Sequence, residues 1–273
     1  MLTQLIRLHT RHFPYHLGKS WAQRYLHGHL TGSEVRATKD GFLLELDNHD
    51  FLQRSINITG EWDREIAQLI RQRMGPGKVF LDVGANIGYF SLLAAHCGAE
   101  VIAVEPNPVC IEKLHANIER NKAIIELHPV AVGQSPGEAR LHIDRDDNLG
   151  GGSVSPVHSA GKAIIVPVDT LDLIVKDRRI DLIKMDIEGA EVQTLLGARK
   201  TLASCAAVVC EVSEYSLTLF GNSKDQLFDI MNSHGFTHQI LSPIRKSNMS
   251  KRAAYFQYDV LFEKADTPEP PGP

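Results

Sequence analysis

The chain has 273 residues, of which 43% are hydrophobic and 23% are charged, a composition typical of folded globular proteins and not of disordered ones. Its 29 basic and 33 acidic residues give a net charge of −4, so the chain lacks the basic surface expected of a general nucleic-acid-binding protein. The four cysteines form no zinc or disulfide pattern, and no apolar run approaches the ~18 residues that span a membrane. We therefore expect a cytoplasmic protein without a membrane span.

Residues 1–60 are predicted to form an appendage with a helix and a β-hairpin. Residues 1–30 mix apolar and basic side chains in a loosely amphipathic pattern, which favours a helix packed on the domain or on a second subunit. Contact with a membrane surface or an anionic substrate is the alternative for this helix. Residues 35–38 and 42–46 flank Asp40-Gly41, a pair that favours a tight hairpin turn. The segment thus predicts a homo-oligomer contact or an acceptor-selecting surface.

Residues 61–264 are predicted to form one α/β domain. A helical pattern over 62–74 ends at Gly75-Pro76-Gly77, and apolar runs at 79–81, 101–104, 180–183 and 206–209 then predict buried strands. Helices are predicted between them at 90–97, 108–120 and 190–202. This alternation favours a mostly parallel sheet with helices on both faces, whose ligands bind beyond the carboxyl ends of the strands.

Two segments are not expected to form regular structure. The polar, glycine-rich stretch 144–162 is predicted to be a long loop over the ligand-binding edge of the sheet. Residues 265–273 hold four prolines and are predicted to be a disordered tail.

Residues 79–90 form a predicted strand that enters a glycine-rich turn and then a helix. A dinucleotide-binding turn needs glycine at its first, third and sixth positions, because the backbone must approach a pyrophosphate closely. Counting from Gly84, the third position is Asn86 and the sixth is Tyr89. A P-loop is also excluded, because no Gly-Lys-Ser/Thr follows this turn at the right distance. The turn therefore suits a nucleoside that carries no phosphate.

A carboxylate follows the next predicted strand. Glu105 lies 23 residues after Asp82, where an acid accepts hydrogen bonds from both hydroxyls of a ribose. Asp82 is expected to orient the turn and the ammonium group of a methionine moiety, directly or through water. This combination predicts S-adenosylmethionine (SAM) as the cofactor, bound by Asp82, Gly84, Asn86, Gly88, Glu105 and Pro106. The alternative is that Asp82 caps the turn and Glu105 caps a helix.

Three more carboxylates are expected at neighbouring strand ends. Asp186 and Glu188 follow the strand at 180–183, and Glu211 follows the strand at 206–209. Acids crowded at one sheet edge are candidates for raised pKa values and for general-base catalysis. The alternative is structural: the acids would stabilise the start of a helix and form an ion pair. We expect Asp186 to act as the base and Glu188 and Glu211 to assist it. With a vicinal diol as acceptor, Asp186 and Glu211 would instead hold Mg²⁺.

The segments 81–88, 104–108, 166–172 and 181–191 together resemble the FkbM family of SAM-dependent methyltransferases. The resemblance covers roughly residues 60–240. It implies a Rossmann-like, class I methyltransferase sheet of seven strands with the last one antiparallel, adenine contacts near Ala131, and a glutamate at Glu211. It also implies methylation of a hydroxyl oxygen on a sugar, a polyketide or another small metabolite.

The prediction for the whole chain is therefore a SAM-dependent O-methyltransferase whose acceptor is a small molecule or glycan and not a nucleic acid. An RNA methyltransferase is the first alternative. The acidic composition and the lack of an Asn-Pro-Pro-Tyr-type tetrapeptide count against it. A non-catalytic nucleoside-binding module is the second alternative, because a fold alone does not specify an activity.

Overall fold

The computed structural model describes residues 29–143, 162–242, 245–246 and 256–264. Its centre is a sheet of eight strands with the order β5-β4-β3-β9-β10-β13-β11 and with β12 paired to β13. The strands are β3 (Val79–Val83), β4 (Glu100–Val104), β5 (Ile125–His128), β9 (Leu182–Met185), β10 (Ala207–Ser213), β11 (Phe236–Ile240), β12 (Arg245–Lys246) and β13 (Phe256–Lys264).

The sheet is mostly parallel. Strands β3, β4, β5, β9 and β10 pair in parallel, whereas β13 runs antiparallel to its neighbours β10 and β11. The predicted α/β, Rossmann-like sheet with an antiparallel last strand is confirmed, and the short β12 adds an eighth strand to the seven implied by the resemblance. No helix in the described ranges is both long and apolar enough to cross a membrane.

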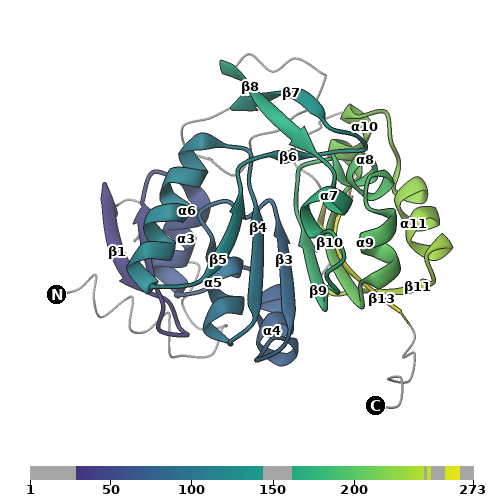
Figure 1. Cartoon of the computed structure of the whole chain (residues 1–273). Helices are drawn as coiled ribbons and strands as arrows, with labels where there is room; N and C mark the ends of the chain where they lie inside the picture. The colour runs from purple at the N-terminus through teal and green to yellow at the C-terminus, as the bar shows by residue number, and fades with distance from the viewer. Residues whose placement is uncertain (1–28, 144–161, 243–244, 247–255, 265–273) are drawn as a thin grey trace.

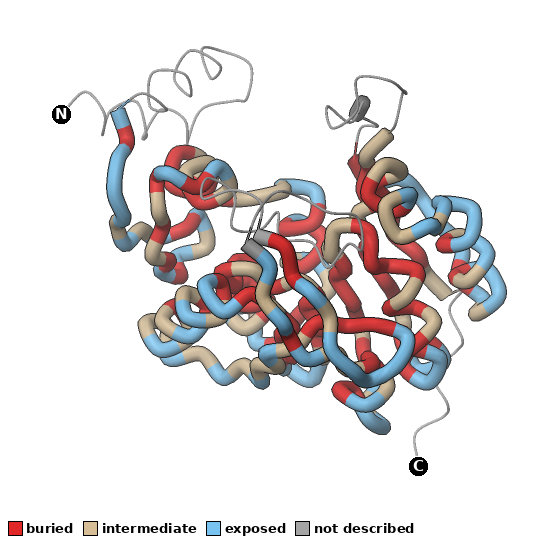
Figure 2. The backbone as a smooth tube through the Cα atoms, turned by 90° about the horizontal axis from the view of Figure 1, so that it is seen from above, coloured by how far each residue is buried: buried red, intermediate tan, exposed pale blue. Residues whose placement is uncertain are grey.

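Helices cover both faces of this sheet (Figure 1). One face carries α3 (Phe51–Thr59), α4 (Arg64–Arg73), α5 (Tyr89–His96) and α6 (Pro108–Asn121), and the other carries α7 (Leu171–Val175), α8 (Glu191–Leu196), α9 (Arg199–Ser204) and α11 (Lys224–Ser233). The short α10 (Glu214–Leu219) follows β10. Two apolar clusters, one on each face, bury the sheet, and Figure 2 shows the buried backbone running through its middle.

One predicted helix is divided. The helix expected over 190–202 forms as α8 and α9, separated at Gly197. A Cβ atom at Gly197 would lie 2.2 Å from the carbonyl oxygen of Gly133, so the chain must bring two backbones together at this point. The close approach explains the interruption, which the helical pattern of the sequence does not reveal.

The predicted hairpin forms as β1 (Ser33–Ala37) and β2 (Leu43–Asp47), and residues 1–28 lie outside the described part of the chain. The outer edge of β2 is bonded to α6. Asn121 accepts from Leu43 N at 2.8 Å and donates to its carbonyl oxygen at 2.7 Å, and Asn117 accepts from Glu45 N at 2.9 Å. These amides occupy backbone groups that would otherwise template another strand. The hairpin is thus fastened to the domain, while its role in a homo-oligomer stays a prediction.

A second, smaller sheet lies above the carboxyl ends of the central strands (Figure 1). Its order is β6-β8-β7, with β6 (Ala131–Val132), β7 (Gly137–Ile143) and β8 (Lys162–Asp169). The sequence does not predict these strands. Residues 144–161 of the predicted loop lie outside the described residues, and Lys162 begins β8 instead of ending the loop.

Candidate functional site

A cavity of about 260 Å³ opens beyond the carboxyl ends of β3, β4, β9 and β10. Of the ten predicted site residues, eight line it: Gly84, Asn86, Glu105, Pro106, Ala131, Asp186, Glu188 and Glu211. The other two, Asp82 and Gly88, are not among its lining residues. The cavity therefore joins the predicted cofactor-binding residues to the predicted catalytic acids.

The glycine-rich turn is fixed by backbone contacts. Gly84 N and Ala85 N both donate to the carbonyl oxygen of Val104, at 2.9 and 3.0 Å. Gly84 has a φ of +80°, and a Cβ atom there would lie 2.0 Å from the carbonyl oxygen of Asp186. Only glycine lets β3 end this close to the segment that follows β9. Gly88 instead serves packing, since a Cβ atom there would lie 2.2 Å from Leu114.

Glu105 is a buried carboxylate that holds the turn in place. Its Oε2 accepts from Asn86 N at 2.8 Å, and its Oε1 accepts from Asn107 N at 2.9 Å. Burial raises the pKa of Glu105 to about 7, against the opposing effect of these two hydrogen bonds. Glu105 thus lines the cavity and also holds the backbone of Asn107, which is the N-cap of α6, so the alternative that Glu105 itself caps the helix is wrong.

Asp82 lies in the sheet interior with no exposed surface. Its Oδ2 accepts from the Ser91 hydroxyl at 2.6 Å, and its Oδ1 lies 3.5 Å from Lys184 Nζ. Lys184, its register partner on β9, lines the cavity and donates to the Gly84 carbonyl oxygen at 2.8 Å. Lys184 is not among the site residues predicted from the sequence. Its sequence signal is a lone lysine inside an apolar strand.

Asp186, Glu188 and Glu211 form an acid cluster, each offering a carboxylate oxygen within 4.8 Å of the others. Burial, reinforced by the charge of Asp186, raises the pKa of Glu188 to about 8 and that of Glu211 well above its ordinary value. Gln257 on β13 donates to Glu211 Oε1 at 2.6 Å. At neutral pH, Glu188 therefore favours its protonated form, and the pKa of Glu211 is raised in the same direction.

Glu191, which sequence reasoning did not select as a functional residue, holds the turn that carries this acid cluster. Its Oε1 accepts from Gly189 N at 3.2 Å and from Ile187 N at 3.4 Å. Burial raises the pKa of Glu191 to about 7. Gly189 is required in the same turn, because a Cβ atom there would lie 2.4 Å from the carbonyl oxygen of Ser216. The acidic motif therefore contains a structural carboxylate that does not line the cavity.

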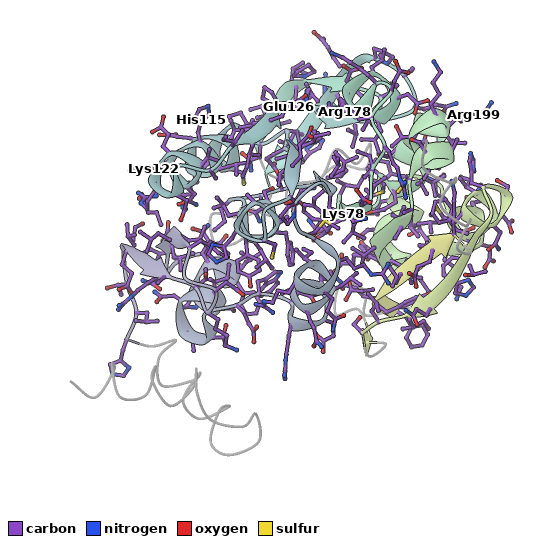
Figure 3. The ribbon with its side chains drawn as sticks, turned by 60° about the horizontal axis from the view of Figure 1, so that its bottom comes forward. Lys78, His115, Lys122, Glu126, Arg178 and Arg199 are labelled. Carbon is purple, nitrogen blue, oxygen red and sulfur yellow. The ribbon has the colours of Figure 1, made fainter. Side chains whose placement is uncertain are left out.

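Two further carboxylates of the motifs link elements of the fold outside the cavity. Asp181 accepts from Val79 N at 2.9 Å, which joins the starts of β9 and β3. Asp172 accepts from Thr201 N at 2.8 Å, which ties α7 to α9. Other charged groups pair at the surface, as Glu126 and Arg178 do at 2.6 Å (Figure 3).

The segment before β3 adds an aromatic wall to the cavity, made of Phe51 and Trp62. Their rings meet edge to face, with centroids 6.3 Å apart and an interplanar angle of 88°. Phe51 is 52% exposed, so a large apolar surface faces solvent at this wall. Sequence reasoning did not select Phe51, because one aromatic at a helix start carries no distinctive pattern.

Comparison with known proteins connects this chain to methyltransferases. The Methyltransferase FkbM domain matches residues 82–237, more than half of the chain. The 31-O-demethyl-FK506 methyltransferase FkbM of Streptomyces tacrolimicus is 29% identical over 196 residues, which cover 59% of this chain and 74% of that protein. The hexuronic acid methyltransferase AglP of Haloferax volcanii is 25% identical, covering 57% of this chain and 64% of AglP.

A third relative is much longer than this chain. The AMB antimetabolite synthetase AmbE of Pseudomonas aeruginosa is 27% identical over 234 residues, which cover 71% of this chain but only 11% of AmbE.

The solved structures that match this chain do so at low similarity. The precorrin-6y C5,15-methyltransferase of Geobacter metallireducens is 13% identical with a TM-score of 0.44, covering 75% of this chain and 91% of that one. The tRNA m1G37 methyltransferase of M. jannaschii is 14% identical with a TM-score of 0.44, covering 86% and 58%. Scores this low carry no conclusion about substrate. The match over residues 82–237 does assign the family: the chain belongs to the FkbM family of SAM-dependent methyltransferases.

Proposed function

We propose that this chain transfers the methyl group of SAM to a hydroxyl oxygen of a small metabolite, sugar or glycan. The observation that carries the proposal is the shared cavity. It is lined both by the turn at Gly84 with the buried Glu105 and by the acid cluster of Asp186, Glu188 and Glu211. A single cavity can therefore hold a methyl donor next to a group that accepts a proton.

The lining residues fit SAM by charge and by shape. Among the described residues that line the cavity, Lys184 is the one cation, so the cavity lacks the basic cluster that phosphates require, and four carboxyl groups are available as hydrogen-bond acceptors for SAM. Glu105 is placed to accept from ribose hydroxyls, and the apolar Ala131, Val132 and Leu141 offer a wall for adenine. When bound, SAM supplies a methyl group on a sulfonium leaving group.

Asp186 is the proposed general base. Its side chain is 39% exposed and therefore accessible to an acceptor. An alcohol is a weak nucleophile while protonated, so a carboxylate within hydrogen-bond reach assists by taking the proton as the new oxygen–carbon bond forms. Glu188, which favours its protonated form, and Glu211, whose pKa is raised in the same direction, would hydrogen-bond the acceptor or the proton-bearing Asp186. Alignment of the acceptor oxygen would supply the rest of the acceleration.

A magnesium ion is the alternative use of the acid cluster, since its three oxygens lie close enough to share a cation. The comparisons give it no support. The local contacts also favour a proton: Lys184 Nζ already lies 3.9 Å from Asp186 Oδ2, and Gln257 occupies one oxygen of Glu211. We therefore expect a chelator to leave methyl transfer unchanged. Loss of transfer with EDTA, restored by Mg²⁺, would assign the acid cluster to a metal.

The test is transfer of labelled methyl from SAM into a panel of hydroxylated metabolites, sugars and glycans, with RNA as a parallel acceptor. We expect an O-methyl product, and we expect Asp186→Asn to lower the transfer rate about 10²- to 10⁴-fold while SAM affinity stays within a few-fold. The matched control is Asp225→Asn on the exposed surface of α11, which should transfer at the wild-type rate.

Each alternative has its own outcome in this assay. Salt-sensitive RNA binding with label in RNA would establish the RNA methyltransferase, which the cavity does not favour, because Lys184 is the one cation among its described lining residues. SAM binding without transfer to any acceptor would favour a non-catalytic module. Label on nitrogen or carbon, or full activity of Asp186→Asn, would refute the proposal.

A further inference from the structure

Lys184 is the single cationic side chain lining the cavity in the described part of the chain. It is 4% exposed, so its ammonium group has lost most of its hydration. Removing a charge from water is costly unless other groups compensate for it. The contacts of Lys184 therefore identify the groups whose positions depend on it.

Three oxygen atoms surround this ammonium group. Nζ donates to the Gly84 carbonyl oxygen at 2.8 Å, and it lies 3.5 Å from Asp82 Oδ1 and 3.9 Å from Asp186 Oδ2. Nζ also lies 5.5 Å from the centroid of the Phe90 ring on α5, within the range of a cation–π contact. Two of the three oxygens belong to residues that line the cavity, Gly84 and Asp186.

The two cavity-lining partners have different proposed tasks. Gly84 belongs to the turn on the cofactor side, and Asp186 is the proposed base. Asp82 lies within the sheet and is held by Ser91, so it anchors the ammonium group from below. A direct link between the turn and the base already exists, because Asp186 N donates to the carbonyl oxygen of Val83, next to Gly84, at 3.1 Å. Lys184 adds the side-chain link.

We propose that Lys184 is a positioning residue that holds the cofactor-side turn and the carboxylate of Asp186 at a fixed separation, through one ammonium group that contacts both. The inference rests on the proposed function for the role of Asp186. Its effect on the turn does not depend on any acceptor. Lys184 also offsets the negative charge of the cavity, so its removal should change how the cavity discriminates between ligands of different charge.

The experiment is calorimetric titration with SAM and with S-adenosylhomocysteine, which has lost the methyl group and the sulfonium charge. Lys184→Met should weaken binding of both ligands about tenfold, because the turn loses a charge-assisted hydrogen bond. It should also shift the affinity ratio several-fold toward SAM, because the cavity becomes more negative. A purely structural defect would weaken both ligands equally and leave the ratio unchanged.

Two further variants keep the test decisive. Asp82→Asn combined with Lys184→Met removes both charges of the buried pair, and should keep the tenfold loss but return the ratio toward wild type. Lys184→Arg keeps the charge but not the geometry of the ammonium group, and should fold, keep the ratio and lose affinity a few-fold. The control is Lys78→Met at the amino end of β3, where Lys78 pairs with Asp181 far from the strand ends that form the cavity (Figure 3).

The role of Lys184 in positioning the turn would be overturned if the double variant bound both ligands with wild-type affinity. If the Lys184→Met variants do not fold, wild-type affinity of Lys184→Arg would overturn it in the same way. The role on Asp186 has a separate readout in transfer. Lys184→Arg should lower kcat about tenfold beyond its effect on SAM binding, and combining it with Asp186→Asn should add little further loss. Additive losses would overturn that role. If no hydroxyl acceptor is methylated, the proposed function fails, whereas the binding results still decide the role on the turn.

Discussion

Two parts of the cavity are built by different physical means: the glycine-rich turn with Glu105, called the turn side, and the acid cluster of Asp186, Glu188 and Glu211, called the acid side. On the turn side, backbone amides of Gly84, Ala85 and Asn86 bond to the Val104 carbonyl oxygen and to Glu105 at 2.8 to 3.0 Å. On the acid side, carboxylates lie within 4.8 Å of one another, and burial and mutual repulsion raise the pKa values of two of them. The turn side is fixed by geometry, whereas the acid side is defined by charge.

This difference separates shape from reactivity. A rigid turn suits a cofactor of constant shape, because its hydrogen-bonding groups are in place before the ligand arrives. Carboxylates that share protons suit a step in which a proton moves. Substitutions on the two sides should therefore damage different properties of the protein.

Gly84→Ala should have the largest effect, because Gly84 lies where the backbone of the turn contacts the backbone of Asp186. The new Cβ would lie 2.0 Å from the Asp186 carbonyl oxygen, at a φ of +80° that L-residues rarely adopt. We expect a loss of about 3 kcal/mol or more in the free energy of unfolding, and no detectable SAM binding. Thermal and urea unfolding with calorimetry would measure both.

Gly77→Ala is the matched control for this change. Gly77 has nearly the same φ, +79°, but a Cβ atom there would meet no atom within 4 Å. Its cost should be only the backbone strain, about 1 kcal/mol. Equal losses in the two variants would show that the contact between the turn and the Asp186 backbone contributes nothing.

Glu105→Gln should weaken the turn side alone. The substitution replaces the carboxylate that is proposed to accept from ribose hydroxyls, and it also disturbs the hydrogen bonds from Asn86 N and Asn107 N. We expect SAM affinity to fall about thirtyfold, with kcat at saturating SAM kept within a few-fold. Glu126→Gln, at the surface beside Arg178, should leave SAM affinity unchanged. A large fall in kcat with unchanged affinity would place Glu105 in the chemistry instead.

The same division explains what the sequence could predict. A local sequence pattern of a strand, a glycine turn and a helix encodes the turn side, so the spacing alone predicts Gly84, Asn86 and Glu105 as site residues. The acid side also follows, because parallel strands end at one edge and the acids directly follow the apolar runs. These residues all reach the cavity.

Other features depend on contacts between distant segments and were missed or misplaced. The partner of Asp82 is a lysine 102 residues further along the chain, on a neighbouring strand, and this pairing removes Asp82 from the cavity surface. In sequence, Glu191 and Asp181 resemble the neighbouring acids that are proposed to be catalytic, but their carboxylates accept from backbone amides. The small sheet of β6, β8 and β7 pairs segments on either side of a polar loop, so no local sequence pattern predicts it.

The acid side should make stability depend on pH. The folded protein raises the pKa of Glu188 from 4.5 to about 8, so between these values the folded state holds a proton that the unfolded state releases. The contribution is fully present below about pH 4.5 and is lost as the pH rises toward 8. We expect Glu188→Gln to remove about 1 to 2 kcal/mol of this pH-dependent change in the free energy of unfolding.

The measurement is urea unfolding at a series of pH values from 5 to 8.5 with no ligand added. Glu119→Gln serves as the control, since the Glu119 side chain is 78% exposed and should leave the pH profile unchanged. A Glu188→Gln profile parallel to that of the wild type would mean that Glu188 does not carry the buried proton.

The aromatic wall should show the smallest effect, and it tests whether acceptor binding can be altered without touching either side of the cavity. Phe51→Ala removes an exposed ring that contacts Trp62 edge to face, and it leaves the turn and the acid cluster intact. We expect the KM of an acceptor with an apolar face to rise three- to tenfold, about 1 kcal/mol, with SAM affinity and stability unchanged. Leu173→Ala, which truncates a side chain of similar exposure on α7 away from the cavity, should change neither KM. Equal acceptor KM values for Phe51→Ala and wild type would assign the wall to packing, and a parallel loss of SAM affinity would move it to the cofactor side.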